Sequence, residues 1–262
     1  MSLDLQSLKR RPVLSSAEAN ALKAGYRTQV PIDANGALAI ERCVDVRTIG
    51  IAGANHYHTP HNPPYYVSVP GSIPELYMRQ SVAAKLTEVN ARLAPLGMEL
   101  FLFDAWRPQA VQRYFHDVWF PAWLQARQPH LEGAALVEEV EHYWAAPSAG
   151  AGSPSPHSTG AAVDLTLIFS ETRQPLFMGG MFDDVTEDAW TDAFERKTTI
   201  SMSDAEALAN RRLLYWVMGE AGFANNPTEW WHFSHGDQLW AKLGRHPAAA
   251  FGGCNPTGRP DA

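Results

Sequence analysis

Two short segments carry the residue types that bind a catalytic metal. The first reads S-P-H-S-T-G-A-A-V-D and ends at Asp164, with His157 seven residues earlier, on the other side of Gly160. The second reads E-W-W-H and contains Glu229 and His232. Imidazole nitrogen and carboxylate oxygen are ordinary zinc ligands, and three protein ligands with one open position are typical of a catalytic zinc site. We therefore predict one zinc ion per chain, bound by His157, Asp164 and His232.

Glu229 is the member of this set that zinc does not need as a ligand. Zinc would lower the pKa of a bound water towards about 7 and polarise a carbonyl group. A carboxylate within hydrogen-bond reach could take the proton of that water as a general base. Arg107, in the segment D-A-W-R-P, could stabilise the oxyanion of a tetrahedral intermediate. On position alone, a structural ion pair or stacking on Trp106 explains Arg107 equally well. Together these groups predict the hydrolysis of an amide bond.

Each of these residues also has a structural interpretation. A histidine in a Pro/Ser-rich loop, such as His157, is more often a surface residue, and Glu229 and His232 could belong to an aromatic core. Asp164 is harder to explain in this way, because an unpaired buried carboxylate is energetically costly and needs a cation or a donor. The His-rich loop at residues 55–66 fits no standard metal site, so we interpret it as structural.

The first segment must contain a break in the backbone. Residues 161–169 are β-prone, so Asp164 lies on a strand, whereas His157 precedes that strand. An offset of seven would put the two side chains on opposite faces of one continuous strand. A turn at Gly160 removes this obstacle.

Glu229 and His232 also have an odd offset. For both to face one site, Glu229 must precede the regular part of the strand predicted at residues 229–234, or lie on a bulge. The other elements follow from hydrophobic periodicity and capping residues. They are helices at residues 16–24 (cap Ser16), 72–96 (capping box Ser72 and Glu75), 109–119 and 203–220 (capping box Ser203 and Glu206), and strands at 45–51 and 98–103.

The composition predicts a folded globular protein. Of its 262 residues, 45% are hydrophobic and 19% are charged, which excludes a disordered chain. We expect a single α+β domain with a mixed or antiparallel sheet flanked by helices. Its expected parts are the domain at residues 41–245, an N-terminal extension at 1–40 packed on it, and a disordered tail at 246–262.

The charge and the hydropathy pattern limit the possible partners. A net charge of −7 argues against nucleic acid and against anionic membranes, because phosphate contacts need clustered cations. No apolar stretch reaches the length of about 18 residues that a membrane span requires. The N-terminus lacks the apolar core of a secretory signal, so we expect a cytoplasmic protein. Cys43 and Cys254 are expected to be free thiols, although the sequence leaves open whether they pair.

The decapeptide at residues 155–164 resembles the S-x-H-x-x-G-x-A-x-D signature of the D-alanyl-D-alanine dipeptidases of the vancomycin-resistance type. That family belongs to a wider group of zinc peptidases with D,D-carboxypeptidases and Hedgehog-like domains. E-W-W-H at residues 229–232 resembles the family's second signature, and D-A-W-R-P at residues 104–108 resembles its arginine corner. The likeness extends over residues 45–233.

The resemblance implies a zinc-dependent hydrolase of D-alanyl-D-alanine or a close D,D-dipeptide, with the ligands, base and arginine named above. It also implies that Ser155 contacts the substrate, and that Asp183, in M-G-G-M-F-D, holds the free ammonium group of the dipeptide. An enzyme for free dipeptides needs an anion for that amine, which an enzyme trimming longer chains does not. Thr48 stands where the family has an aromatic residue, which bears on side-chain specificity.

Two alternatives stay open at the level of sequence. One is a D,D-carboxypeptidase that acts on longer cell-wall peptides. The other is a non-catalytic zinc-binding domain that recognises a ligand, as Hedgehog-like relatives do. Glu229 argues against the second alternative, because a binding domain has no use for a base beside the metal. The oligomeric state is not determined by the sequence.

Overall fold

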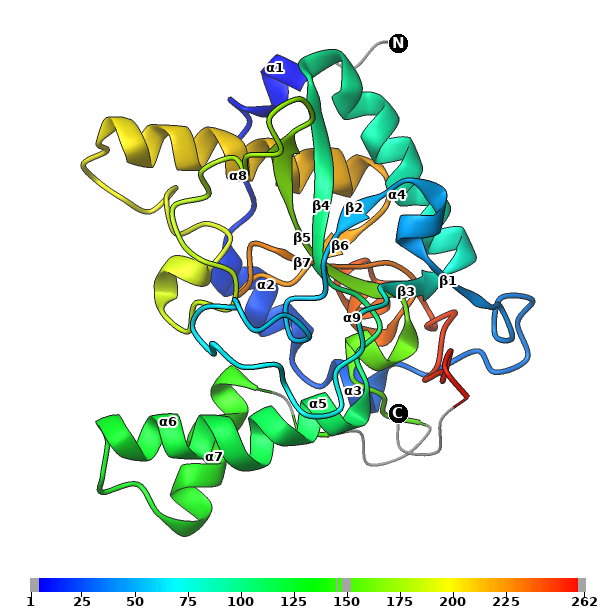
Figure 1. The fold of residues 1–262 in the computed structure, drawn as a ribbon, viewed down its shortest axis with the longest axis vertical. Helices are drawn as coiled ribbons and strands as arrows, with labels where there is room; N and C mark the ends of the chain where they lie inside the picture. Colours follow the sequence, from blue (N-terminus) through cyan, green and yellow to red (C-terminus); the bar gives the residue numbers. More distant parts are fainter. Residues whose placement is uncertain (1–4, 145, 148–151, 259–262) are drawn as a thin grey trace.

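A five-stranded mixed sheet forms the centre of the computed structural model, which describes residues 5–144, 146–147 and 152–258 (Figure 1). The strand order is β2-β4-β5-β7-β6, with β2 parallel to β4 and the other neighbours antiparallel. The predicted α+β class with a mixed sheet is therefore confirmed. The strands are β2 (Ala52–Gly53), β4 (Met98–Asp104), β5 (Ala162–Phe169), β6 (Ala224–Asn225) and β7 (His232–Ser234).

The two central strands differ in how they are buried. Residues of β4 alternate between buried and half-buried, whereas every residue of β5 except Phe169 is buried. Burial on both faces explains why β5 is an almost continuous apolar run, and it makes the one carboxylate in that run, Asp164, exceptional. Both strands match the predicted positions closely.

Two long helices cover the sheet. The helix α4 (Gln80–Leu93) packs against β4, and α8 (Met202–Glu220) packs against β5 and passes behind the sheet in Figure 1. The apolar side chains that they bury belong to the same core cluster as those of the sheet. From α4 these are Val82, Leu86, Val89 and Leu93, and from α8 they are Leu213, Leu214, Val217 and Met218.

The start of α4 differs from the prediction. The capping box at Ser72 predicted a helix from that residue, but the helix begins at Gln80. The intervening residues Tyr77–Arg79 form the strand β3, which pairs antiparallel with Cys43–Asp45 (β1). The hydrogen bonds of this pairing and the burial of Met78 outweigh the local capping signal.

Smaller differences concern the ends of other elements. The capping box of α8 uses Ser201 and Asp204, two residues before the predicted pair. The cap of α2 is Ser15, one residue before the predicted one. These two shifts are within the range over which helix ends are defined. The strand predicted at residues 45–51 is wrong for most of its length, because Val46–Ile49 form a 3-10 turn.

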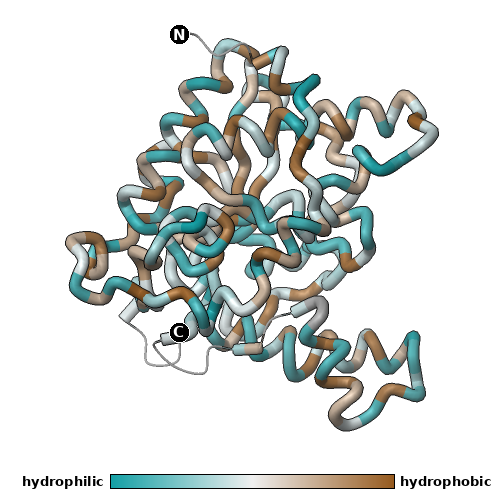
Figure 2. The backbone as a smooth tube through the Cα atoms, turned by 180° about the vertical axis from the view of Figure 1, so that it is seen from behind, coloured by the Kyte–Doolittle hydropathy of each residue, from teal (hydrophilic) through white to brown (hydrophobic). Residues whose placement is uncertain are grey.

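A helical arm projects from the body of the molecule (Figure 1). Figure 2 shows hydrophobic and hydrophilic residues alternating along it. Trp144, which follows the arm, is buried against Phe115 and Phe120, with ring centroids 4.5 Å and 5.5 Å apart. The arm comprises α5 (Gln109–Tyr114), the π-helical turn Phe115–Trp119, α6 (Phe120–Arg127) and α7 (Gly133–Tyr143).

The N-terminal residues pack against helices from the C-terminal half of the chain. Helix α1 (Leu5–Leu8) contacts α8, while α2 (Ser16–Lys23) and α3 (Tyr26–Gln29) contact α9 (Gln238–Leu243). These contacts place the end of α2 near the β6–β7 turn.

The C-terminal residues also pack on the body as far as the structure describes them. A disordered tail was expected from residue 246, but Ala249 pairs with Ile32 in a β-bridge, and both Ala249 and Phe251 are buried. Phe251 provides the apolar contact that a Gly/Pro/Ala-rich composition did not indicate. The last expected residues of the tail, 259–262, lie outside the described part of the chain.

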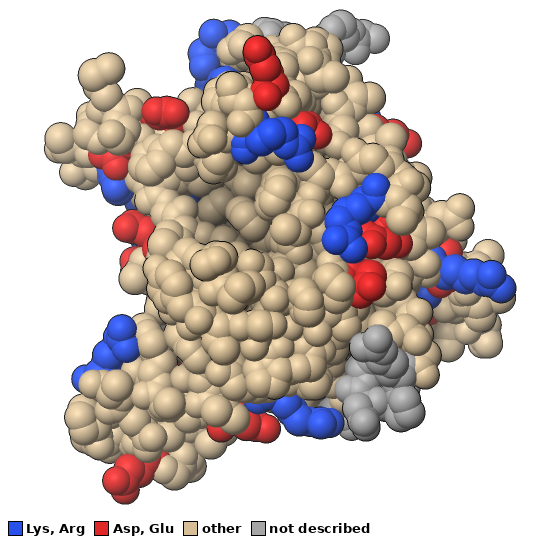
Figure 3. Space-filling model, in the orientation of Figure 1, with Lys and Arg blue, Asp and Glu red and all other residues tan. Residues whose placement is uncertain are grey.

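Charged side chains are dispersed over the face seen in Figure 3. The Lys and Arg side chains visible there lie apart from one another, and several lie beside acidic ones. In the described residues, no helix combines the length and the apolar character that crossing a membrane would require.

Candidate active site

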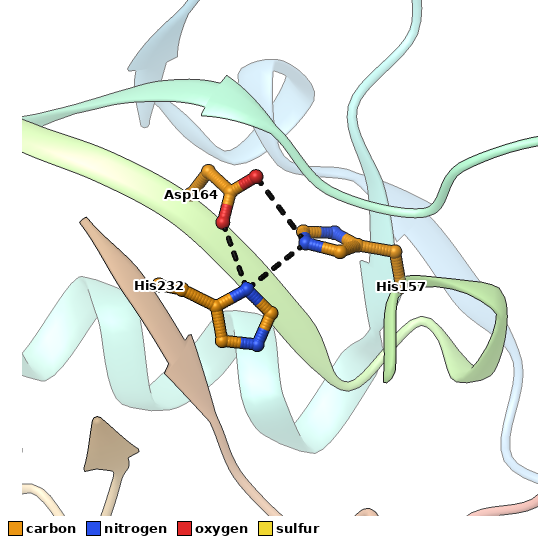
Figure 4. A group of neighbouring side chains, drawn as sticks. All are labelled: His157, Asp164 and His232. Carbon is orange, nitrogen blue, oxygen red and sulfur yellow. Dashed lines mark hydrogen bonds and ion pairs between the residues drawn. The ribbon is translucent and has the colours of Figure 1, made fainter. Parts of the chain in front are cut away.

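Strand register brings together two of the three predicted metal ligands. Asp164 on β5 lies directly opposite His232 on β7, and on its other side it lies opposite Asp104 at the end of β4. Directly opposed residues on antiparallel strands have side chains within contact distance of each other. His157 reaches the same point from the 3-10 turn Pro156–Thr159, and the three side chains point toward one another in Figure 4.

Gly160 provides the break that the offset of seven requires. Its φ is +68°, and it caps the turn that carries His157 before the chain enters β5. A Cβ at this position would lie 2.9 Å from the Sγ atom of Cys43, so the site requires glycine for space as well as for conformation. Cys43 and Cys254 are free thiols, with their sulfur atoms 3.6 Å apart.

The three candidate ligands form a compact buried cluster. Asp164 Oδ2 lies 3.2 Å from His157 Nε2, and Asp164 Oδ1 lies 3.0 Å from His232 Nδ1. The two histidine nitrogens are 3.1 Å apart. One donor atom from each residue lies within 4.8 Å of the other two, so together they could hold a metal ion.

The surroundings of His157 determine which of its nitrogens carries a proton. Its Nδ1 lies 2.7 Å from the carbonyl oxygen of Ala105 and 3.4 Å from a carboxylate oxygen of Asp104. Both are acceptors, so Nδ1 is the protonated donor. In the neutral ring, Nε2 therefore presents a lone pair to Asp164 and His232.

His232 is oriented in a similar way by Ser234 and Asp237. The hydroxyl of Ser234 donates to Asp237 Oδ2 at 2.7 Å, so its oxygen is left to accept from His232 Nε2 at 3.4 Å. The protonated nitrogen of neutral His232 is then Nε2, and Nδ1 presents a lone pair to the cluster. Asp237 is itself fixed, because its Oδ1 caps α9 by accepting from the amide of Trp240.

The donor groups of this cluster are of the kinds that bind a metal ion. Two imidazole lone pairs and a carboxylate converge in a buried site, and their mutual repulsion is relieved by a cation between them. Burial would raise the pKa of Asp164, but without a metal, protonated His157 and His232 would hold that pKa well below its usual range through their charges and hydrogen bonds. A metal cation between the neutral rings would favour the ionised carboxylate in the same way.

Glu229 lies beside this cluster and is more exposed than its members. The strand β7 begins only at His232, so Glu229 precedes the regular pleat and both side chains can face one site. Its Oε2 is 3.6 Å from His232 Nδ1, and its side chain is 33% exposed. It is close enough to act on a group at the cluster and open enough to meet water.

Arg107 is held rigidly against the cluster. Its Nε donates to Asp104 at 2.8 Å, and its Nη2 is 3.3 Å from Asp164 Oδ2. Nη1 donates to Gln112, and Trp144 packs over the guanidinium with its ring centroid 4.6 Å away. The ion pair and the aromatic stacking expected as alternatives are both present, although the aromatic partner is Trp144 and not Trp106. These contacts also hold the guanidinium group of Arg107 in a fixed position within the site.

Asp183 is connected to Arg107 through the hydroxyl of Tyr57. Its Oδ2 accepts hydrogen bonds from the hydroxyls of Tyr57 and Tyr65 at 2.8 Å and 2.9 Å. Burial and the nearby charge of Asp164 raise the pKa of Asp183 to about 7. Its φ of +58° is unusual for a residue other than glycine, so the surrounding structure stabilises a strained backbone to place this carboxylate.

All seven candidate residues line one cavity of about 640 Å³. Ser155 lies in it as the residue that precedes the turn of His157. The His-rich loop at residues 55–66 contributes Tyr65, whereas His56 packs edge-on against Phe182. The cavity is lined by His157, Asp164, His232, Glu229, Arg107, Ser155 and Asp183, among others.

Several residues that support the cluster were not among the predicted site residues. Asp104, which contacts both Arg107 and His157, could have been found because it lies within the motif D-A-W-R-P. Tyr57 and Asp237 carry no comparable signal, because only the folding of distant segments brings them to Asp183 and His232.

The fold and the cavity define the protein as an α+β protein in which a candidate metal-binding cluster lies beside a further carboxylate and a fixed arginine. A family model agrees with this description. The M15 peptidase model, described as D-ala-D-ala dipeptidase, matches residues 75–248. The chain belongs to this family, and the peptidase class predicted from the motifs is confirmed.

Individual relatives support the same assignment. The chain is 38% identical over 178 residues to a protein of Synechocystis named D-alanyl-D-alanine dipeptidase, covering 63% of this chain and 71% of the relative. A protein of the same name from Enterococcus faecalis is 30% identical over 154 residues, which are 59% of this chain and 70% of the relative. A third, from Streptomyces coelicolor, is 32% identical over 156 residues, with 59% and 71% covered.

Proposed function

We propose that this protein is a zinc-dependent dipeptidase that hydrolyses D-alanyl-D-alanine or a close D,D-dipeptide. The observation that carries the proposal is the convergence of two oriented imidazole lone pairs and an ionised carboxylate beside Glu229. Membership of the D-ala-D-ala dipeptidase family supports the substrate class. In the proposed site, His157, Asp164 and His232 hold the zinc ion. When bound, zinc supplies a Lewis acid that polarises a carbonyl and lowers the pKa of a coordinated water.

The other residues would perform the proton transfer and position the substrate. Glu229 accepts the proton of the attacking water and returns it to the nitrogen of the leaving amine. Arg107 stabilises the negative charge that develops on the carbonyl oxygen, and its ion pairs keep it fixed while this happens. Asp183 binds the free ammonium group of the dipeptide, and Ser155 contacts the substrate at the edge of the cavity.

The decisive experiment compares a dipeptide with a longer substrate, with and without a metal chelator. We expect the zinc-loaded protein to hydrolyse D-alanyl-D-alanine, and we expect the chelator to abolish this activity until zinc is restored. Preferential cleavage of a cell-wall pentapeptide would instead indicate a D,D-carboxypeptidase. Zinc binding without hydrolysis of either peptide would indicate a recognition domain.

The ammonium-binding role predicts a pH dependence of substrate binding. Only the ionised form of Asp183 attracts an ammonium group, and its pKa is raised to about 7. As the pH falls below that value the carboxylate is protonated, so KM for D-alanyl-D-alanine should rise by about tenfold per pH unit. Steady-state kinetics between pH 8 and pH 5.5 measure this.

A matched variant and a matched substrate test the assignment. Asp183→Asn should have a high KM that no longer depends on pH in this range. N-acetylated D-alanyl-D-alanine lacks the ammonium group and should be a poor substrate for the unmodified protein. Normal cleavage of the acetylated dipeptide would contradict the role of Asp183.

The hydrogen bonds behind His232 predict an effect on zinc affinity. Asp237→Asn keeps a side-chain oxygen that can cap α9, but it presents an amide donor to Ser234 in place of an acceptor. The hydroxyl of Ser234 would then donate to His232 Nε2, which disfavours the tautomer that presents a lone pair at Nδ1. We expect zinc affinity to fall by about 10–100-fold, the usual effect of losing an outer partner of a ligand. Competition with a fluorescent chelator measures it. An unchanged affinity in both Asp237→Asn and Ser234→Ala would show that these residues do not orient the ligand.

A further inference from the structure

The N-terminal helix α2 contributes a lysine to the proposed dipeptide site. Asn20, Lys23 and Tyr26 line the same cavity as Glu229 and the metal-binding cluster. These residues precede the part of the chain that the family model matches, which begins at residue 75. The helix is held in place by a reciprocal pair of hydrogen bonds, in which Ser16 N donates to Asp192 Oδ2 and Asp192 N donates to Ser16 Oγ.

The ammonium group of Lys23 is fixed by neutral partners. It donates to Asn226 Oδ1 at 2.9 Å and to Thr228 Oγ1 at 3.3 Å, both in the β6–β7 turn that carries Glu229. Burial lowers the pKa of Lys23, and the charge of Glu229 opposes this shift. The lysine is therefore oriented in a partly desolvated position where a carboxylate partner would be strongly favoured.

Lys23 is one of few cationic side chains among the residues that line the cavity. Two of the residues that line the cavity carry a Lys or Arg side chain, namely Lys23 and Arg107. Arg107 is already paired with the carboxylates of Asp104 and Asp164, whereas the hydrogen-bond partners of Lys23 in the described chain are neutral. The remaining charged side chains of the lining are acidic: Glu141, Asp164, Asp183, Asp184, Glu187 and Glu229. A substrate with a carboxylate needs a cation here.

Asp183 and Lys23 line the same cavity but approach the candidate metal site through different neighbours. Asp183 lies with Tyr57 and Tyr65 on the side of the cluster formed by Arg107. Lys23 lies with Asn226 on the turn that precedes His232. The first group reaches the candidate metal site through Arg107, and the second through the turn that carries Glu229.

We propose that Lys23 binds the terminal carboxylate of the substrate, so that helix α2 completes a site selective for free peptides. This inference rests on the proposed dipeptidase function. It makes Lys23 a specificity-determining residue whose partner is the α-carboxylate of the C-terminal residue. A peptide blocked at that end would lose the interaction even if its scissile bond were unchanged.

The test compares D-alanyl-D-alanine with its C-terminal amide, D-alanyl-D-alaninamide, on the zinc-loaded full-length protein. We expect the unmodified protein to prefer the free acid by about 10–100-fold in kcat/KM, as for a hydrogen-bonded charged pair. Lys23→Met should lower kcat/KM for the acid by a similar factor, mainly through KM, and leave the amide within about twofold. Lys23→Arg, which keeps the charge, should recover part of the preference.

Lys242 provides a matched control. Its ammonium group donates to Gln29 and so also ties the N-terminal residues to α9, but it does not line the cavity. Lys242→Met should retain the full preference for the acid, which separates loss of the charge from loosening of the N-terminal helices.

Three outcomes are distinguishable. Equal losses for acid and amide in Lys23→Met, with a shifted pH profile of kcat, would overturn the proposal and make the lysine a positioning residue for Glu229. An unmodified protein that does not discriminate between acid and amide would overturn it without any variant. If the unmodified zinc-loaded protein cleaves neither substrate, the proposed dipeptidase function itself fails.

Discussion

Replacing Glu229 with glutamine should lower kcat for D-alanyl-D-alanine by about 10²–10⁴-fold, the usual contribution of a positioned general base. Glutamine has the same shape as glutamate but cannot accept a proton at neutral pH. The side chain of Glu229 is 33% exposed, and its Oε2 lies 3.6 Å from His232 Nδ1. The substitution should therefore leave the fold intact. Steady-state kinetics measure the loss.

The metal content of the same variant separates two roles for this carboxylate. The three ligands assigned to zinc do not include Glu229, so Glu229→Gln should retain close to one zinc per chain by atomic absorption. Loss of zinc in this variant would show that Glu229 is a ligand. Glu141→Gln is a suitable control, because Glu141 is another glutamate that lines the cavity but has no proposed role. Its kinetics should match those of the unmodified protein.

Arg107 is expected to contribute the second largest effect. Removing a preorganised group that stabilises the oxyanion lowers kcat by about 10²–10³-fold. Arg107→Lys is the informative variant, because it keeps a positive charge beside Asp104 while losing the planar fork that pairs with both carboxylates. We expect kcat to fall in this range while KM changes by less than a factor of a few. A change confined to KM would make Arg107 a substrate-binding residue only.

Arg107→Ala should have a different primary effect. It leaves the fully buried carboxylate of Asp104 without its ion-pair partner. Breaking a buried ion pair in this way costs about 3–5 kcal/mol, so we expect a clear loss in the free energy of unfolding. Chemical denaturation of both variants distinguishes this structural role from the catalytic one. Equal stability of Arg107→Ala and the unmodified protein would contradict the structural role.

Local patterns in the sequence predicted much of the fold. The apolar runs that form β4 and β5 were placed almost to the residue, because a short apolar run bounded by turn residues is typical of a buried strand. The beginning of α4 could not be predicted in this way. Ser72 provides a local capping signal, but Tyr77–Arg79 pairs with a strand more than thirty residues earlier in the chain. A local sequence pattern does not indicate pairing between strands that are far apart in the chain.

The candidate metal site could also be predicted from local sequence only in part. His157, Gly160 and Asp164 form one short motif whose spacing already required a turn, and the structure contains that turn. The odd offset of Glu229 and His232 required the glutamate to lie outside the regular strand, as it does. Side-chain type and local spacing thus predicted which groups could converge.

The partners of those groups were decided by tertiary structure alone. Asp237 orients His232, and Tyr57 and Tyr65 hold Asp183, through contacts between segments far apart in the sequence. Lys23 enters the cavity because an N-terminal helix packs beside the β6–β7 turn. A buried charge or polar atom must have a partner, but any of many residues can satisfy it. The chain therefore encodes its reactive groups locally, while burial in the folded state selects the residues that position them.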